Sequence, residues 1–240
     1  MASTPAPTPD PTAAAHRPAF ESLLAERYSC RGFRPDEVPR ETIQTILRLA
    51  QRTASWCNSQ PWQVIVNGAA ATERLRAALM ATMTAAAPGE PLAFDIAPPA
   101  DYRGVYKDRR RACGFQLYDS VGIAHGDREA SGRQAQQNFA FFGAPHVAIV
   151  TTEALLGSYG MLDCGAYVHN FMLAARSVGV ASIAQAALAG RSAFLRDWFQ
   201  IPAERQVVCG ISFGFEDPQH PANRFRTPRA EAAETCRWVD

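Results

Sequence analysis

The pattern of apolar and polar positions predicts helices that alternate with short strands. After Pro39, apolar residues recur at three- and four-residue intervals, which is the spacing of one helix face: Ile43, Ile46, Leu47 and Ala50. Pro39 suits the start of this helix, because its missing N–H costs nothing there. Trp62 to Val66 follows as an expected strand.

The same reading extends along the rest of the chain. From 161 to 178 apolar residues run almost all the way round a helix, which predicts burial inside the domain or against another subunit. Because helices outnumber and interrupt the strands, we expect an α+β sandwich with a mixed central sheet flanked by helices. The other expected helices are 20–27, 72–86, 109–123, 131–142 and 192–199; the other strands are 146–152, 180–184 and 206–213, with an irregular stretch over 88–104.

The first 17 residues differ from the rest. Prolines alternate with small residues there and little can be buried, so we expect 1–17 to be a disordered tail and 18–240 to be one domain.

Composition excludes several classes of protein. The 24 basic and 23 acidic side chains give a net charge of +1, which offers no reason to expect nucleic acid or an anionic membrane as partner. There is no run of 18 apolar residues and no secretory pattern at the N-terminus. The six cysteines form no Cys-x-x-Cys pair and the five histidines do not join them, so a zinc site has little support. We expect free thiols in the cytoplasm.

Arg27, Ser29 and Arg31 are candidates for binding a phosphate. In an extended chain, side chains at alternate positions point to one side. Two guanidinium groups and a hydroxyl would then form a phosphate receptor, although a solvated arginine pair after a helix is the simpler explanation of this segment taken alone. Arg224 and Arg226 form a similar pair far downstream, where a polar tail is the plain alternative.

The segment from Ser55 to Trp62 is polar and lies between an expected helix and an expected strand. The amides of Asn58 and Gln60 can both donate and accept, so they are candidates for binding the edge N and C=O groups of a flat heterocycle. An Asn-rich turn anchored by a tryptophan is the structural alternative.

Together these segments resemble the nitroreductase family of flavoproteins. The resemblance rests on Arg27-x-Ser29-x-Arg31 followed by Asn58-Ser59-Gln60-Pro61-Trp62, and it covers about residues 20–230. Three later stretches are similar to a bacterial branch of nitrobenzoate and nitroaromatic reductases: residues 109–115, 138–145 and 223–226.

The resemblance implies an intertwined homodimer with two FMN sites shared between the subunits. Arg27, Tyr28, Ser29 and Arg31 match positions that hold the FMN phosphate and ribityl chain. Arg226 matches a phosphate ligand near the C-terminus, and Arg224 matches a neighbouring basic position. Ser55, Trp56 and Asn58 match positions where the second subunit meets the flavin. Gln185, Ala186 and Ala187 match the loop beside the flavin ring.

Two positions depart from the family pattern. Trp56 stands where many members have a serine, so it should reshape the pocket. Ala186 and Ala187 stand where the loop often carries Glu-Gly, which leaves only backbone contacts to the ring.

The implied activity is NADH- or NADPH-dependent reduction of a nitroaromatic to nitroso and hydroxylamino products. The rivals are reduction of an enone, a quinone or a halogenated aromatic, and a non-catalytic flavin-binding protein. No side chain is expected to act as a nucleophile. Asp163 and His169 are expected to make structural contacts, and packing is the main role expected for four aromatic residues: Phe115, Tyr118, Phe141 and Phe142.

Overall fold

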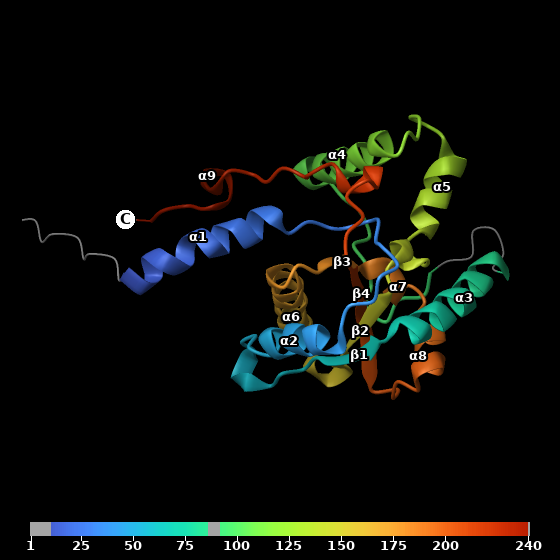
Figure 1. The fold of residues 1–240 in the computed structure, drawn as a ribbon, viewed down its shortest axis with the longest axis horizontal. Coiled ribbons are helices and arrows are strands. Elements are labelled where there is room, and N and C mark those ends of the chain that lie inside the picture. Colours follow the sequence, from blue (N-terminus) through green and yellow to red (C-terminus); the bar gives the residue numbers. More distant parts are fainter. Residues whose placement is uncertain (1–10, 86–91, 240) are drawn as a thin grey trace, which may run out of the picture.

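The computed structural model describes residues 11–85 and 92–239, and it shows an α+β fold as expected (Figure 1). The α-helices of the described chain are α1 (Pro11–Glu26), α2 (Arg40–Ala50), α3 (Ala69–Ala85), α4 (Gly104–Ser120), α5 (Arg128–Gln136), α6 (Gly157–Ser177), α7 (Ala186–Ala189), α8 (Ser192–Phe199) and α9 (Ala232–Thr235). The strands are β1 (Gln63–Asn67), β2 (His146–Glu153), β3 (Ala181–Gln185) and β4 (Arg205–Gly214). Part of the expected irregular stretch, 88–91, and the expected end of a helix at 86 lie outside the described residues.

The four strands form one sheet in the order β1-β2-β4-β3. Ile65 of β1 pairs with Ile149 of β2, and Ile149 pairs in turn with Gly210 of β4. All three pairings between these strands are antiparallel, whereas we expected a mixed sheet. A strand's apolar pattern reports its burial but not its direction, which the route of the connecting helices decides. A parallel bridge does join Ser29 to Ser182 of edge strand β3.

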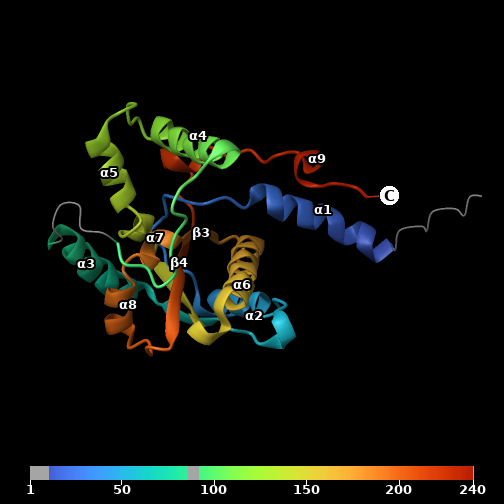
Figure 2. The same ribbon diagram turned by 180° about the vertical axis from the view of Figure 1, so that it is seen from behind.

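The sheet is covered on both faces, and β2 shows how the sequence achieves this. Ala148 and Val150 belong to one apolar cluster, while Val147 and Ile149 belong to the other. Alternate residues of a strand point to opposite faces, so a continuous apolar run fits a strand buried on both sides. Helices α2 and α6 pack on the first face, and α3 and α8 pack on the second (Figures 1 and 2).

Helix α1 begins at Pro11, so the prediction of a structureless tail is wrong for residues 11–17. Ala14 and Ala15 are strong helix formers, and proline is tolerated in a first helical turn. Their side chains are exposed, which explains why an apolar pattern did not report this part of the helix. Residues 1–10 of the expected tail lie outside the described chain.

Two helices are only thinly covered within the single chain. None of the side chains of α4 is buried, although the helix has 17 residues. Helix α6 buries Tyr167 and Phe171 but leaves Tyr159 and Leu162 exposed. The expected buried helix at 161–178 is therefore buried on one face only. Among the described helices, none has the length and apolar character needed to cross a membrane.

Candidate functional site

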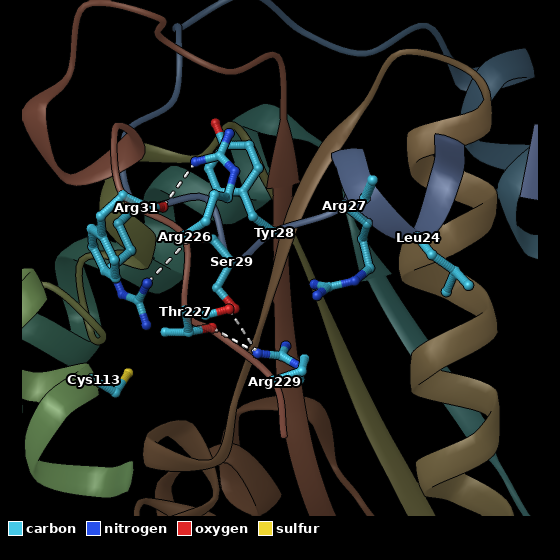
Figure 3. Close-up of a pocket in the computed structure, with 11 residues that line it drawn as sticks. Leu24, Arg27, Tyr28, Ser29, Arg31, Cys113, Arg226, Thr227 and Arg229 are labelled. Carbon is cyan, nitrogen blue, oxygen red and sulfur yellow. Dashed lines mark hydrogen bonds between the residues drawn. The ribbon is translucent and has the colours of Figure 1, made fainter. Parts of the chain in front are cut away.

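A cavity of about 310 Å³ lies between the end of α1, helix α4 and the C-terminal segment (Figure 3). Its most common lining group is the guanidinium. The residues that line it are Leu24, Ala25, Arg27, Tyr28, Ser29, Arg31, Cys113, Phe225, Arg226, Thr227 and Arg229. Arg27, Ser29, Arg31 and Arg226, which we selected from the sequence, are thus brought together.

The chain after α1 is extended, and this places its first wall. Ser29 bridges Ser182 of β3, and the backbone N–H of Cys30 donates to the Ser182 carbonyl at 3.2 Å. Because extended side chains alternate, Cys30 is buried while Arg27, Ser29 and Arg31 line the cavity. Burial raises the pKa of the Cys30 thiol to about 11, so this thiol stays protonated at neutral pH.

The buried side chain of Asn223 fixes the second wall. Its Oδ1 accepts from the Arg31 backbone N–H at 2.8 Å, and its Nδ2 donates to the carbonyls of Gly32 and Asp217. These bonds join the C-terminal segment to the Arg31 segment. Arg226 and Arg229 follow directly and therefore reach the same cavity as Arg31.

Tyr28 and Arg226 stack at the rim. The Arg226 guanidinium carbon lies 3.6 Å from the centre of the Tyr28 ring, and the Tyr28 hydroxyl donates to Glu216 Oε2 at 2.8 Å. Burial, reinforced by the bond to Glu216, raises the pKa of Tyr28. Tyr28 is therefore a neutral platform rather than a proton donor to bases at physiological pH.

The cavity is rich in positive charge and poor in compensation. Within residues 11–85 and 92–239, no carboxylate forms an ion pair with Arg27, Arg31, Arg226 or Arg229. Burial lowers the pKa of Arg31, and burial together with the charge of Arg229 lowers the pKa of Arg27. Both groups nevertheless remain charged at neutral pH.

Such a set of donors fits a phosphate dianion. Guanidinium groups offer paired donors to phosphate oxygens, and the Ser29 hydroxyl can donate as well. An anion would relieve the repulsion between neighbouring cations that the protein leaves uncompensated. The cavity therefore fits the FMN phosphate expected from the sequence. Separately, the described part of the chain contains no cluster of residues that could hold a metal ion.

Ser55, Trp56 and Asn58 lie elsewhere. They occupy the loop between α2 and β1, which Figures 1 and 2 place away from α4, and none of them lines the cavity. Trp56 is 62% exposed and lies 5.0 Å from the ring of Tyr159, while its backbone N–H donates to Asp163 Oδ2 at 3.0 Å. Within one chain this loop is an outward-facing element, so Trp56 does not narrow the cavity of its own chain.

Gln185 is 2% exposed, and its amide is engaged within the protein. The Nε2 donates to the Asn138 carbonyl at 2.8 Å, and the Oε1 accepts from the Ser212 hydroxyl. Ala186 is exposed and Ala187 half-buried, at the end of the strand that bridges Ser29. This loop adjoins the cavity's first wall but does not line the cavity.

Arg224, another residue selected from the sequence, also lies outside the cavity lining. Its side chain is exposed and donates to the Gln219 carbonyl at 3.1 Å. Six lining residues were not selected from the sequence: Leu24, Ala25, Cys113, Phe225, Thr227 and Arg229. The spacing of Arg226 and Arg229 could have suggested the last, but nothing in the pattern of α4 singled out Cys113.

The remaining candidates lie outside the cavity lining. Asp163 is buried and holds the Trp56 backbone, and His169 is exposed. Phe141 and Phe142 are buried in the protein, as packing requires. Phe115 and Tyr118 are half-buried on α4.

Comparison with known proteins identifies the family. The description "Nitroreductase family" matches residues 24–215. The chain is 37% identical over 226 residues to nitroreductase NfnB of Mycolicibacterium smegmatis, with 92% of each chain covered, and 34% identical to a 4-nitrobenzoate reductase of Nocardioides sp., with 92% of this chain and 91% of the relative covered.

The solved structures agree. The FMN-dependent NfnB of Mycobacterium smegmatis, crystallised with NADPH, superposes with a TM-score of 0.87 at 34% identity, covering 94% of this chain and 100% of that one. An FMN- and NADPH-dependent NfnB from sphigopyxis sp. strain HMH gives a TM-score of 0.85 at 30% identity, covering 92% of this chain and 98% of that one. The chain therefore belongs to the nitroreductase family.

Proposed function

We propose that this chain is an FMN-dependent oxidoreductase that uses NADH or NADPH to reduce nitroaromatic compounds to nitroso and hydroxylamino products. The observation that carries the proposal is the cavity of uncompensated arginines, which fits a phosphate monoester. The relatives described as nitroreductases and nitrobenzoate reductases supply the substrate class.

The residues have distinct roles in this proposal. Arg27, Arg31 and Arg226 hold the FMN phosphate, with Arg229 beside them, and Ser29 binds the ribityl chain. The backbone of Gln185, Ala186 and Ala187 would contact the flavin ring. The chemistry that FMN supplies when bound is hydride transfer from NAD(P)H and two-electron reduction of an electron-poor acceptor.

No side chain needs to act as a nucleophile in this reaction. The protein holds the cofactor, keeps the acceptor against it and excludes water. The thiols of Cys30, Cys164 and Cys209 are buried with pKa values raised by burial, to about 11, 11 and 12. They are therefore unsuited to nucleophilic chemistry.

The enzyme works as a homodimer in which each site is shared. The exposed face of α6 carries Leu162, Gly165, Ala166 and His169 at helical spacing. A partly apolar, uncovered helix face is typical of a subunit interface. A second copy seated there would cover the exposed Trp56 loop and bring Ser55, Trp56 and Asn58 of one chain to the flavin of the other.

The cytoplasm is the compartment that suits this enzyme. It supplies NAD(P)H, and its reducing conditions fit the free thiols of Cys57 and Cys236, both exposed. The described fold would act there as one FMN-binding domain.

Absorbance of the purified protein tests the proposal. The protein should be yellow, its flavin band should bleach under NAD(P)H without oxygen, and 4-nitrobenzoate should restore the band. A colourless protein that FMN cannot reconstitute would refute the proposal. A yellow protein that NAD(P)H never bleaches would indicate a flavin carrier, and restoration by quinones or enones but not by nitroaromatics would reassign the acceptor.

A further inference from the structure

A second cavity of about 500 Å³ opens beside the arginine cavity, between α4 and the C-terminal segment. Three residues line both cavities, which makes them neighbours: Cys113, Thr227 and Arg229. The rest of the second cavity is lined mainly by aromatic rings and guanidinium groups. Its other lining residues are Tyr102, Tyr106, Arg109, Arg110, Ala112, Gln116, Pro228 and Ala230.

The side chains of this second cavity do little for the fold. No side chain of α4 is buried, and the Tyr106 side chain is 68% exposed. Arg109 makes only a long contact of 3.9 Å with Glu234, and both of these side chains are about half exposed. An exposed ion pair of this kind contributes little to stability. These residues therefore remain available to bind a ligand.

The chemistry of the walls indicates a ligand that is both aromatic and anionic. The Arg110 guanidinium carbon lies 5.2 Å from the centre of the Tyr102 ring, which orients it, and Arg109 lies one position before it on the same helix. The exposed Tyr106 ring can stack on a base, and the two guanidinium groups can bind a phosphate. Gln116 also lines this cavity, and its side-chain amide can bind an exocyclic amine.

We infer that this cavity binds the adenosine 2′-phosphate half of NADPH and thereby makes the enzyme prefer NADPH to NADH. The inference rests on the proposed function, since it names the donor of the same reaction. Arg109 and Arg110 bind the 2′-phosphate, and Tyr106 stacks on the adenine. The diphosphate passes Arg229, which lines both cavities, toward the flavin.

Binding of 2′,5′-ADP to the FMN-loaded wild-type protein gives the first test. This compound carries the 2′-phosphate but cannot donate a hydride, so calorimetry measures the subsite apart from turnover. We expect 2′,5′-ADP to bind at least about tenfold more tightly than 5′-AMP, since a charged hydrogen bond is worth this factor. Equal affinities would overturn the inference while leaving the flavin band, and so the proposed function, intact.

Steady-state kinetics with Arg110→Ala give the second test. KM for NADPH should rise by about tenfold with little change in kcat, while KM for NADH stays the same. Lys107→Ala is the matched control, because it removes a positive charge from exposed α4 outside the cavity lining. An equal loss for both donors, or a loss equal to that of the control, would overturn the inference. Flavin content and melting temperature check that each variant is folded.

Discussion

At the scale of single residues, the arginine cavity depends on individual side chains that the rest of the chain does not neutralise. Arg31 contributes a guanidinium whose pKa is lowered by burial, and it lies 6.0 Å from the Phe142 ring centre and 5.9 Å from that of Phe225. A buried cation without a carboxylate partner is costly unless an anion binds. The structure therefore links Arg31 to the anion more closely than to stability.

Arg31→Ala should weaken FMN binding by about tenfold or more, because charged hydrogen bonds to phosphate are lost. Arg224→Ala is the control, since Arg224 is also an arginine of this region but lies outside the cavity. Flavin fluorescence on titration of the apoprotein measures both affinities. Equal losses in the two variants would contradict the assignment of the phosphate to this cavity.

His146 makes a different residue-scale prediction, about pH and stability. Its Nε2 accepts from the Val38 N–H at 3.0 Å and its Nδ1 lies 3.1 Å from the Asn67 carbonyl, so the neutral ring satisfies both partners. Burial lowers its pKa in the folded protein, although the Asn67 bond and the charge of Glu37 oppose this. The unfolded chain then binds more protons, and stability falls as pH drops below about 6.5.

The change His146→Gln removes this titration. We expect wild type to exceed the variant in unfolding free energy at pH 7.5, and we expect that advantage to shrink by pH 5.5. Urea unfolding at the two pH values measures the difference. An advantage that is constant with pH would show that His146 does not titrate on unfolding in this range.

At the scale of elements, the sequence pattern predicted the bounds of those helices and strands that bury an apolar face. Helix α8 was predicted at its observed bounds, β2 within one residue at each end, and the start of α2 within one residue. The sequence did not predict the exposed N-terminal half of α1, the antiparallel pairing of the strands or the packing position of α4. None of these three features leaves an apolar period in the local sequence.

The candidate site was predictable only in part, because local spacing reports some of its residues and not those brought in by tertiary packing. Alternation along an extended segment selected Arg27, Ser29 and Arg31, and the structure places all three in one cavity. Cys113 and Arg229 reach it through the packing of segments far apart in the chain. No local spacing reports such packing, so Arg224 was chosen in place of Arg229.

The junction of the C-terminal segment with the Arg31 segment gives the prediction at this scale. Asn223 does not line the cavity, but its three hydrogen bonds hold the two walls together. Asn223→Ala should reduce FMN affinity and also destabilise the apoprotein by about 1–3 kcal/mol, because buried partners lose their bonds. Arg31→Ala, by contrast, should reduce affinity without a comparable loss of apoprotein stability. Flavin titration and urea unfolding of both variants distinguish a positioning residue from a ligand.

At the scale of the whole molecule, the two candidate regions are separate within one chain. The cavity lies by α4 and the C-terminal segment, whereas the Trp56 loop projects beside the start of α6, near Tyr159 (Figure 1). The resemblance predicts that both regions meet the flavin, and one chain does not bring them together. The proposed dimer with two-fold symmetry would resolve this, because each interface contact would then occur twice and each site could take its loop from the other chain.

Mixing two inactive variants tests this arrangement directly. Arg31→Ala disables the cavity, and Trp56→Glu places a carboxylate on the loop without disturbing a buried side chain, since Trp56 is 62% exposed. Each homodimer should then have low nitroreductase activity. In the mixed dimer one site carries both changes and the other carries neither.

After unfolding, mixing and refolding in equal amounts, about a quarter of all sites should be intact by random pairing of symmetric subunits. Recovery of activity to about that fraction requires shared sites. No recovery, with mixed dimers demonstrated by mass, would show that each chain completes its own site, and full activity of Trp56→Glu alone would exclude the loop from the flavin.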